Sequence, residues 1–237
     1  MKKLLLFLLV SFSISHLMAQ SMEWLCRPGK FSDIQYMGFD LFKVRNNVDK
    51  WGIVSAEGKE VLDVEYDSIT PFVENRALIM DEAGRRILGI LDTNGDIIKS
   101  FENEEIYATS YPYYKDGLLG YKERNGLCGY INSMGRISIS ARFYLAAPFQ
   151  DGVATVQYAD GDGYYGLINK SGGSAIISDT KYKYLSSVVD GQLLAVTSSS
   201  RGGDLLRIMR LDVNRLKAIK TLESKMFVDL SDDFTYL

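Results

Sequence analysis

The sequence predicts an all-β protein built as a tandem array of about five antiparallel β-meander or hairpin repeats. Three observations carry this prediction. Pairs of glycines recur at steps of 37, 40 and 37 residues, runs rich in β-branched and aromatic residues flank them, and polar turn residues separate the runs. A period of this size is typical of repeat architectures. We expect an open, curved, solenoid-like array, and the alternative is a closed β-propeller.

The chain begins MKKLLLFLLVSFSISHLMAQ, which has the layout of a secretory signal peptide. Lys2 and Lys3 precede an apolar run of about 11 residues, which is shorter than the roughly 20 that a membrane-spanning helix needs. The first cysteine, Cys26, lies too far downstream for a lipid anchor. We therefore expect residues 1–19 to be a signal peptide and residues 20–237 to form a single exported domain without a transmembrane segment, in the periplasm, at the outer surface or secreted.

Removal of residues 1–19 would take away the only histidine, His16. It would leave 25 basic and 30 acidic residues, a net charge of about −5. A mature chain without histidine has no imidazole base and no histidine metal ligand. Its acidic balance argues against a nucleic-acid partner. We expect no catalytic residue, no cofactor and no metal site.

Four segments align on two glycines six residues apart: WGIVSAEGKEVL, LGILDTNGDIIK, CGYINSMGRISI and YGLINKSGGSAI. The first glycines are Gly52, Gly89, Gly129 and Gly166, and the second are Gly58, Gly95, Gly135 and Gly172. Only the second glycine is shared among the four turns, so we expect positive φ there, as at the αL position of a short hairpin loop. The residue before the first glycine is Trp51, Leu88, Cys128 or Tyr165, and we expect this position to pack in the core. Trp51 is then a packing residue rather than a ligand platform.

A second marker keeps the same period in YDSITPFVENRALIM, EEIYATSYPYYKDGLLGY, FYLAAPFQDGVATV and YKYLSSVVDGQLLAV. We align Ile34, Ile69, Ile106, Leu145 and Leu185 on it. The units are then approximately 31–65, 66–104, 105–142, 143–181 and 182–225. In residues 205–237 the alignment with the earlier units favours strands. The alternative is a short helix, with one face formed by Leu216, Ile219, Leu222 and Met226.

These segments resemble the WG-repeat family, found in many bacterial proteins, whose units typically read KWGYID...G followed by F..GLA.V. The match runs from about residue 31 to 200, and Lys50-Trp51-Gly52 keeps the signature tripeptide. The resemblance implies a single WG-repeat β domain over residues 20–237, without a known catalytic centre. Because the positions shared by the family look structural, the resemblance carries no functional residues over to this chain.

Three short motifs have a structural and a functional interpretation. Cys26 and Cys128 form an even pair in an exported chain, which allows a disulfide. The position of Cys128 favours a buried thiol instead. DGDG at 160–163 superficially suits a calcium loop but lacks further oxygen ligands, so we expect a turn. ENEE at 102–105 is interpreted as a solvated acidic loop.

The segment YPYYK interrupts the third unit as a small insertion and is the candidate binding site. Its tyrosines, Tyr111, Tyr113 and Tyr114, could offer stacking faces for sugars or anchor points for a protein. The alternative is that Tyr113 or Tyr114 fills the gap between neighbouring units.

The sequence thus favours an exported, non-enzymatic repeat module for protein–protein or envelope interaction. The first alternative is a cell-surface carbohydrate-binding protein, because of the tyrosine-rich loops. A glycoside hydrolase that uses carboxylates alone is a remote alternative. The partner, an unidentified protein or envelope glycan, is not specified by these patterns.

Overall fold

The computed structural model describes residues 29–176, 180–199, 202–212 and 215–223. The predicted signal peptide, Cys26 and Met226 lie outside these residues. The described part of the chain contains strands and turns but no α-helix, so none of its segments is a helix that could cross a membrane. At the C-terminal end, residues 204–212 and 215–223 are strands, and the helix considered as an alternative does not form there.

The described residues form antiparallel sheets. The first sheet contains β1 (Asp33–Gly38), β2 (Leu41–Arg45), β3 (Trp51–Ser55) and β4 (Glu60–Tyr66) in that order. The second contains β5 (Ser68–Ile69), β6 (Ala77–Met80), β7 (Ile87–Leu91) and β8 (Ile97–Ser100). The third is ten-stranded and contains β9 (Tyr107–Ala108), β10 (Leu118–Lys122), β11 (Cys128–Asn132), β12 (Ile137–Ala146), β13 (Val153–Tyr158), β14 (Tyr165–Asn169), β15 (Tyr182–Leu185), β16 (Gln192–Ser198), β17 (Asp204–Asp212) and β18 (Arg215–Glu223). Within each sheet every strand pairs with its neighbours in the chain, so each sheet is a meander.

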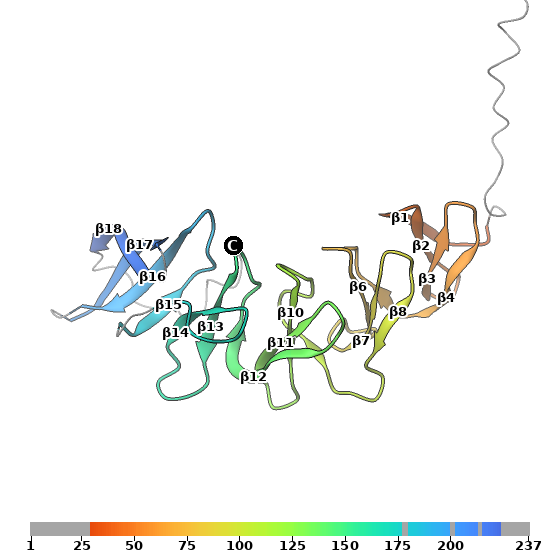
Figure 1. Ribbon diagram of the computed structural model, residues 1–237. Helices are drawn as coiled ribbons and strands as arrows, with labels where there is room; N and C mark the ends of the chain where they lie inside the picture. The colour runs from red at the N-terminus through yellow and green to blue at the C-terminus, as the bar shows by residue number, and fades with distance from the viewer. Residues whose placement is uncertain (1–28, 177–179, 200–201, 213–214, 224–237) are drawn as a thin grey trace, which may run out of the picture.

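The meanders follow one another as an open, curved row (Figure 1). The sheet of β1 to β4 lies at one end of the row, and β16 to β18 lie at the other. A closed propeller would bring the first and last units side by side. The all-β, open-array prediction is therefore confirmed, and the propeller alternative is not the arrangement observed.

Strand β12 joins two units without a break. Tyr130 of β11 pairs with Ile139 in its first part, whereas Ala146 at its end pairs with Val156 of β13. The predicted unit limit between residues 142 and 143 falls inside this strand. The third to fifth units share one sheet because of this continuity and because β14 pairs with β15.

The second glycine of each pair has positive φ, as predicted: 77° at Gly58, 85° at Gly95, 71° at Gly135 and 82° at Gly172. In each turn the glycine N–H donates to the carbonyl oxygen three residues earlier, for example Gly135 to Asn132 at 2.9 Å. The side chain at the first turn position also accepts a hydrogen bond from a backbone N–H. The residues at this position are Ser55, Asp92, Asn132 and Asn169. The turns thus share a side-chain acceptor as well as the glycine, which the sequence comparison missed.

The first glycine of each pair lies where a neighbouring group approaches closely. A Cβ at Gly52 would be 2.7 Å from the carbonyl oxygens of Leu62 and Asp63. At Gly129 it would collide with the carbonyl oxygen of Ile139 on β12. The ladders beside both glycines carry register shifts, so the adjacent strand bulges towards them. Gly166 differs, because its close neighbour is the ring of Tyr158.

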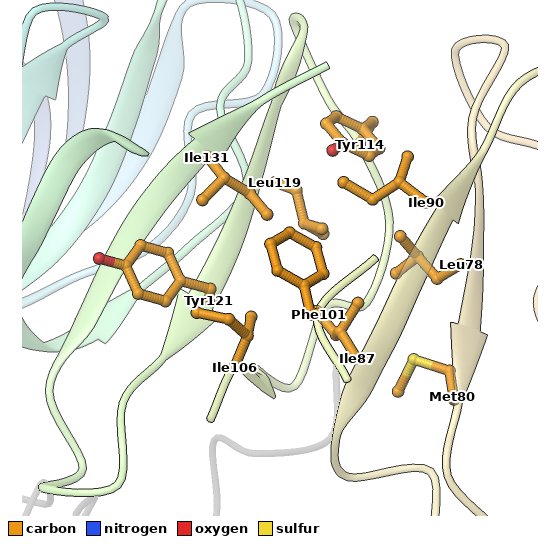
Figure 2. Close-up of a cluster of buried hydrophobic side chains, with 10 residues drawn as sticks. All are labelled: Leu78, Met80, Ile87, Ile90, Phe101, Ile106, Tyr114, Leu119, Tyr121 and Ile131. Atoms are coloured by element: carbon orange, nitrogen blue, oxygen red, sulfur yellow. The ribbon is translucent and has the colours of Figure 1, made fainter. Parts of the chain in front are cut away.

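The hydrophobic core lies between successive meanders. Figure 2 shows one such cluster, with side chains from β6 and β7 facing side chains from β10 and β11. Its buried residues are Leu78, Met80, Ile87, Ile90, Phe101, Ile106, Tyr114, Leu119, Tyr121 and Ile131. A two- to four-stranded meander cannot bury such an apolar face alone, so stacking stabilises each unit through its neighbour.

The residue before each first glycine packs in these cores, as predicted. Trp51 and Leu88 pack against the cluster between the first and second units, and Tyr165 packs against the cluster of the last units. Cys128 is 2% exposed. Lys43 Nζ and the Arg45 guanidinium lie 4.3 and 5.3 Å from the Trp51 ring centre, so cations of its own sheet cover the indole.

A carboxylate ladder links the two-residue turns at the start of successive units. Both oxygens of Glu74 accept backbone N–H groups of the next unit, from Asp116 at 2.8 Å and Gly117 at 2.7 Å. Asp116 Oδ2 in turn accepts the N–H of Gly152 at 2.7 Å. These bonds fix the second, third and fourth units relative to one another along the edge of the array.

The structure corrects two positions of the second sequence marker. Three of the marker residues occupy equivalent places, because the strand partner of each lies four residues after the two-residue turn of its unit. The pairs are Ile34 with Val44, Ile69 with Ile79 and Leu185 with Ala195. The equivalent positions in the third and fourth units are Ala108 and Ala146. Ile106 and Leu145 are therefore two residues and one residue out of register. Alanine replaces the bulky residue at these positions, so a search for large apolar residues shifted the alignment.

Candidate functional site

Tyr111 and Tyr113 form an exposed aromatic pair in the loop between β9 and β10. Their side chains are 40% and 39% exposed, and their rings meet edge to face with centroids 6.3 Å apart. The loop is held by its own hydrogen bonds, because Tyr111 N donates to Thr109 Oγ1 at 3.2 Å and Tyr113 N donates to Tyr111 O at 2.9 Å. The chain therefore presents both rings to solvent from a braced turn.

Tyr114 is not a surface residue, which corrects its assignment to the candidate binding site. It is 1% exposed and lies in the cluster between the second and third units, beside Ile90 and Leu119 (Figure 2). Its hydroxyl donates to the backbone carbonyl of Asn132 at 3.0 Å. Burial raises the pKa of this hydroxyl well above its usual value. Tyr114 fills the gap between units, as the alternative interpretation allowed.

A second, half-buried tyrosine pair lies on two neighbouring strands of the same sheet. The Tyr184 ring of β15 packs against the Tyr165 ring of β14, with centroids 5.5 Å apart. Burial raises the pKa of Tyr184, and Tyr111 raises it further. We call Tyr113, Tyr111, Tyr184 and Tyr165 the tyrosine row. Its members come from different units, so the sequence pattern within one unit could not show it.

A surface pocket of about 290 Å³ lies at the DGDG hairpin between β13 and β14. We call it the hairpin pocket, and its lining residues are Tyr158, Asp160, Gly161, Asp162, Tyr164 and Lys181. The segment forms a turn, as predicted, with Gly161 and Gly163 at φ of 65° and 67°. A smaller hollow of about 170 Å³ between the first two sheets is lined by Glu65, Tyr66, Ile79, Leu88, Ile97, Ser100 and Glu102.

The acidic loop ENEE is paired with basic side chains. Lys99 Nζ lies 2.5 Å from Glu104, and an Arg124 nitrogen lies 3.4 Å from Glu105. Both pairs are partly exposed, so each contributes little to stability. In the described part of the chain no three His, Cys, Asp or Glu side chains gather closely enough to hold a metal ion.

Cys128 is a free, buried thiol. Its sulfur lies 3.7 Å from the carbonyl oxygen of Tyr144, and burial raises the pKa of the thiol. The neutral form is therefore favoured, and the side chain behaves as a small apolar core residue. The prediction of a buried thiol is confirmed for Cys128, and Cys26, the other cysteine, lies outside the described residues.

The model of the WG containing repeat family matches this chain at residues 51–82 and 129–161. Among solved structures, puromycin hydrolase is similar at 13% identity over 84% of this chain and 38% of that chain, with a TM-score of 0.38. The WD40 beta propeller domain of Doa1 is similar at 11% identity over 84% of this chain and 70% of that chain, with a TM-score of 0.33. The chain thus spans well under two thirds of the hydrolase. A search of curated proteins gave no match.

Proposed function

Because this chain is a protein of the WG-repeat family, we propose that it is an exported, non-enzymatic module that binds a protein partner through the tyrosine row. The supporting observation is that Tyr111 and Tyr113 expose about two fifths of their side chains on a braced loop. Buried apolar residues of an array need no partner to explain them. Two adjacent aromatic rings held on a fixed, solvent-facing loop offer a contact area that suits a protein partner.

Tyrosine suits this role because it brings a large contact area at a small cost in side-chain entropy. The loop is also fixed before binding by the bonds of Thr109 and Tyr111. Such preorganisation lowers the free-energy cost of association. The row spans different units, so a partner that covers it would contact several meanders at once.

The non-enzymatic part of the proposal is supported by the chemistry of the chain. His16 is the only histidine of the sequence and lies in the predicted signal peptide. Glu104 and Glu105 are paired with Lys99 and Arg124, so they are not poised as an acid and base pair. A substrate turnover that is lost on changing one surface carboxylate would contradict this part of the proposal.

The proposed surface can be tested with a double variant, Tyr111→Ala with Tyr113→Ala. Proteins captured from envelope extract by the native chain are identified, purified and titrated by calorimetry. We expect the double variant to weaken binding by about tenfold or more, since central tyrosines of interfaces each contribute about 1 kcal/mol or more. Tyr36→Ala is the matched control, because Tyr36 is 66% exposed but lies on β1 in the first unit. Equal loss in the control, or unchanged binding in the double variant, would refute the surface.

The same native chain and double variant distinguish a carbohydrate ligand from a protein partner. A glycan that binds the native chain and loses affinity only in the double variant would replace the protein partner. The edge-to-face arrangement of Tyr111 and Tyr113 favours the protein, because the rings do not share one flat stacking plane.

Export is a separate element of the proposal and rests on residues 1–19. It is tested by expressing the full chain in a bacterium and measuring the mass of the product in each fraction. We expect a cell-envelope or secreted product that lacks residues 1–19. A product that keeps Met1 and stays in the cytoplasm would contradict export without affecting the tyrosine row.

A further inference from the structure

The hairpin pocket is built by a turn whose shape is fixed by hydrogen bonds. Tyr158 N donates to Tyr164 O at 2.9 Å, and Gln157 Nε2 donates to Gly163 O at 2.9 Å. Both glycines of the turn have positive φ. The two tyrosines that end the turn and the two aspartates within it are therefore held around one hollow.

An ammonium group of the chain itself lines this hollow. Lys181 Nζ lies 4.8 Å from the centre of the Tyr164 ring and 3.4 Å from Asp162 Oδ2. An ammonium over an aromatic face and beside a carboxylate is the arrangement that stabilises an organic cation in water. Both side chains of this ion pair are more than two thirds exposed, so the pair is weak and can exchange with another cation.

The charge of the pocket leaves room for a second cation. Asp160 and Asp162 bring two negative charges, and Lys181 pairs with Asp162. Burial raises the pKa of Tyr158, and Arg142 lies near enough to that tyrosine to lower it in part. Asp160 makes no hydrogen bond or ion pair with another residue that the structure describes. The tyrosine rings and the exposed carboxylate of Asp160 together suit a group that is flat or apolar along its stem and positive at its tip.

We propose that the hairpin pocket binds a primary ammonium or guanidinium group, with Asp160 as the counter-ion and Tyr158 and Tyr164 as the aromatic walls. A lysine or arginine side chain of a protein fits the volume of about 290 Å³. This site is distinct from the tyrosine row. The inference does not depend on the proposed function and can hold when that proposal fails.

The test uses N-acetyl-lysine methylamide as the probe and N-acetyl-norleucine methylamide as its uncharged match. Binding to the ¹⁵N-labelled mature chain is followed through the backbone amide signals of Gly161 and Gly163. We expect saturable shifts with the lysine probe, with a Kd in the millimolar range that weakens as salt is raised. No saturable shift with lysine, or equal shifts with norleucine, would overturn the proposal. Saturation by glucose, cellobiose or Ca²⁺ without saturation by lysine would overturn it as well.

Variants separate the cation site from a merely structural turn. Asp160→Asn should weaken lysine binding by about fivefold, because it removes the negative charge of the counter-ion. Lys181→Met should strengthen binding severalfold, because it removes the competing ammonium. Asp63→Asn, an exposed aspartate on β4, is the control and should leave the affinity unchanged. Unchanged affinity in both pocket variants would overturn the assignment, and amide spectra outside the hairpin report whether each variant keeps its fold.

A third probe, butylammonium, distinguishes a free amine from an amino group carried on a polypeptide. Equal affinities of butylammonium and the lysine probe would indicate a free amine as the ligand. Tighter binding of the lysine probe would indicate a side chain carried on a polypeptide. Both results support a cation site and differ only in what brings the cation to it.

Discussion

At the scale of single residues, the two glycines of each repeat have different physical roles. The second glycine, for example Gly135, adopts a backbone conformation that side chains disfavour. The first, for example Gly129, has ordinary φ but no space for a Cβ. A substitution at the first glycine therefore acts through collision, and its cost depends on which atom lies opposite.

This difference predicts unequal effects of alanine at two equivalent glycines. At Gly129 a Cβ would meet the rigid backbone of Ile139 and Ala141, whereas at Gly89 its nearest neighbours are 3.3 Å away. We expect Gly129→Ala to lower the free energy of unfolding by about 1–3 kcal/mol and Gly89→Ala to lower it by less than about 1 kcal/mol. Urea denaturation of the two variants measures this. Equal losses would show that the bulge beside Gly129 can relax.

The buried tyrosines predict a loss of stability in alkali. Tyr130 is fully buried, its hydroxyl donates to Ala147 O at 2.7 Å, and burial raises its pKa above the ordinary value of 10.0. The folded state keeps this proton at a pH where the unfolded chain loses it. The stabilisation is therefore complete below pH 10 and declines as pH rises from 10 towards the folded-state pKa, by about 1.4 kcal/mol per pH unit for each such tyrosine.

Tyr130→Phe separates this effect from general alkaline unfolding. The variant should be about 1 kcal/mol less stable at pH 8, because it loses the hydroxyl's hydrogen bond. Its stability should then fall less steeply above pH 10 than that of the native chain. Parallel urea series at pH 8, 10 and 11 provide the slopes, and identical slopes would contradict the role of Tyr130.

At the scale of elements, the turns connect units as well as strands. Glu74 closes its own hairpin and at the same time accepts two N–H groups of the turn that begins the third unit. Hydrogen bonds to a carboxylate are stronger than those to a neutral oxygen. The hydrogen bonds of Glu74 in this carboxylate ladder are exposed, so competition from water lowers their contribution to stability. They still fix the position of one turn relative to the next.

Glu74→Gln tests the ladder, because the side chain keeps its size and one acceptor oxygen but loses its charge. We expect a loss of about 1 kcal/mol, which corresponds to about 2–4 °C in Tm for a chain of this length. Glu82→Gln, in the exposed turn between β6 and β7, is the control and should change Tm by less than about 1 °C. The experiment is thermal unfolding followed by circular dichroism. A similar change in both variants would indicate a general charge effect.

The period of the glycines was enough to predict strands and turns, because those properties are local and repeat. It did not decide between an open array and a closed propeller, because closure depends on how all the units are placed. The continuity of β12 was not predicted, because the glycine-marked segment and the second marker extend into its two halves and were assigned to separate units. Ile106 and Leu145 were misplaced because alanines occupy the equivalent positions. The candidate site was predicted in part: Tyr111 and Tyr113 stood out as an insertion, whereas the Tyr165–Tyr184 ring pair joins residues of different units and has no signal within one unit. For the hairpin pocket, the available signal was Tyr158 and Tyr164 on either side of DGDG.

At the scale of the whole molecule, the clusters between successive meanders make stability a nearest-neighbour property. Each cluster joins adjacent units, and β1 to β4 share no sheet with the distant β15 to β18. Damage at one interface should therefore remain close to that interface. A single globular core would instead lose stability throughout.

Phe101→Ala tests this property at the interface of Figure 2, where the phenylalanine ring lies in the middle of the cluster and is 1% exposed. Loss of a buried phenylalanine costs about 3–5 kcal/mol. We expect amide hydrogen exchange to accelerate most in β6, β7, β10 and β11 and least in β16 and β17, because opening is local in a stacked array. Leu193→Ala, in the cluster of the last units, should give the reverse distribution. If both variants accelerate exchange equally along the chain, the units unfold as one body and the nearest-neighbour description fails.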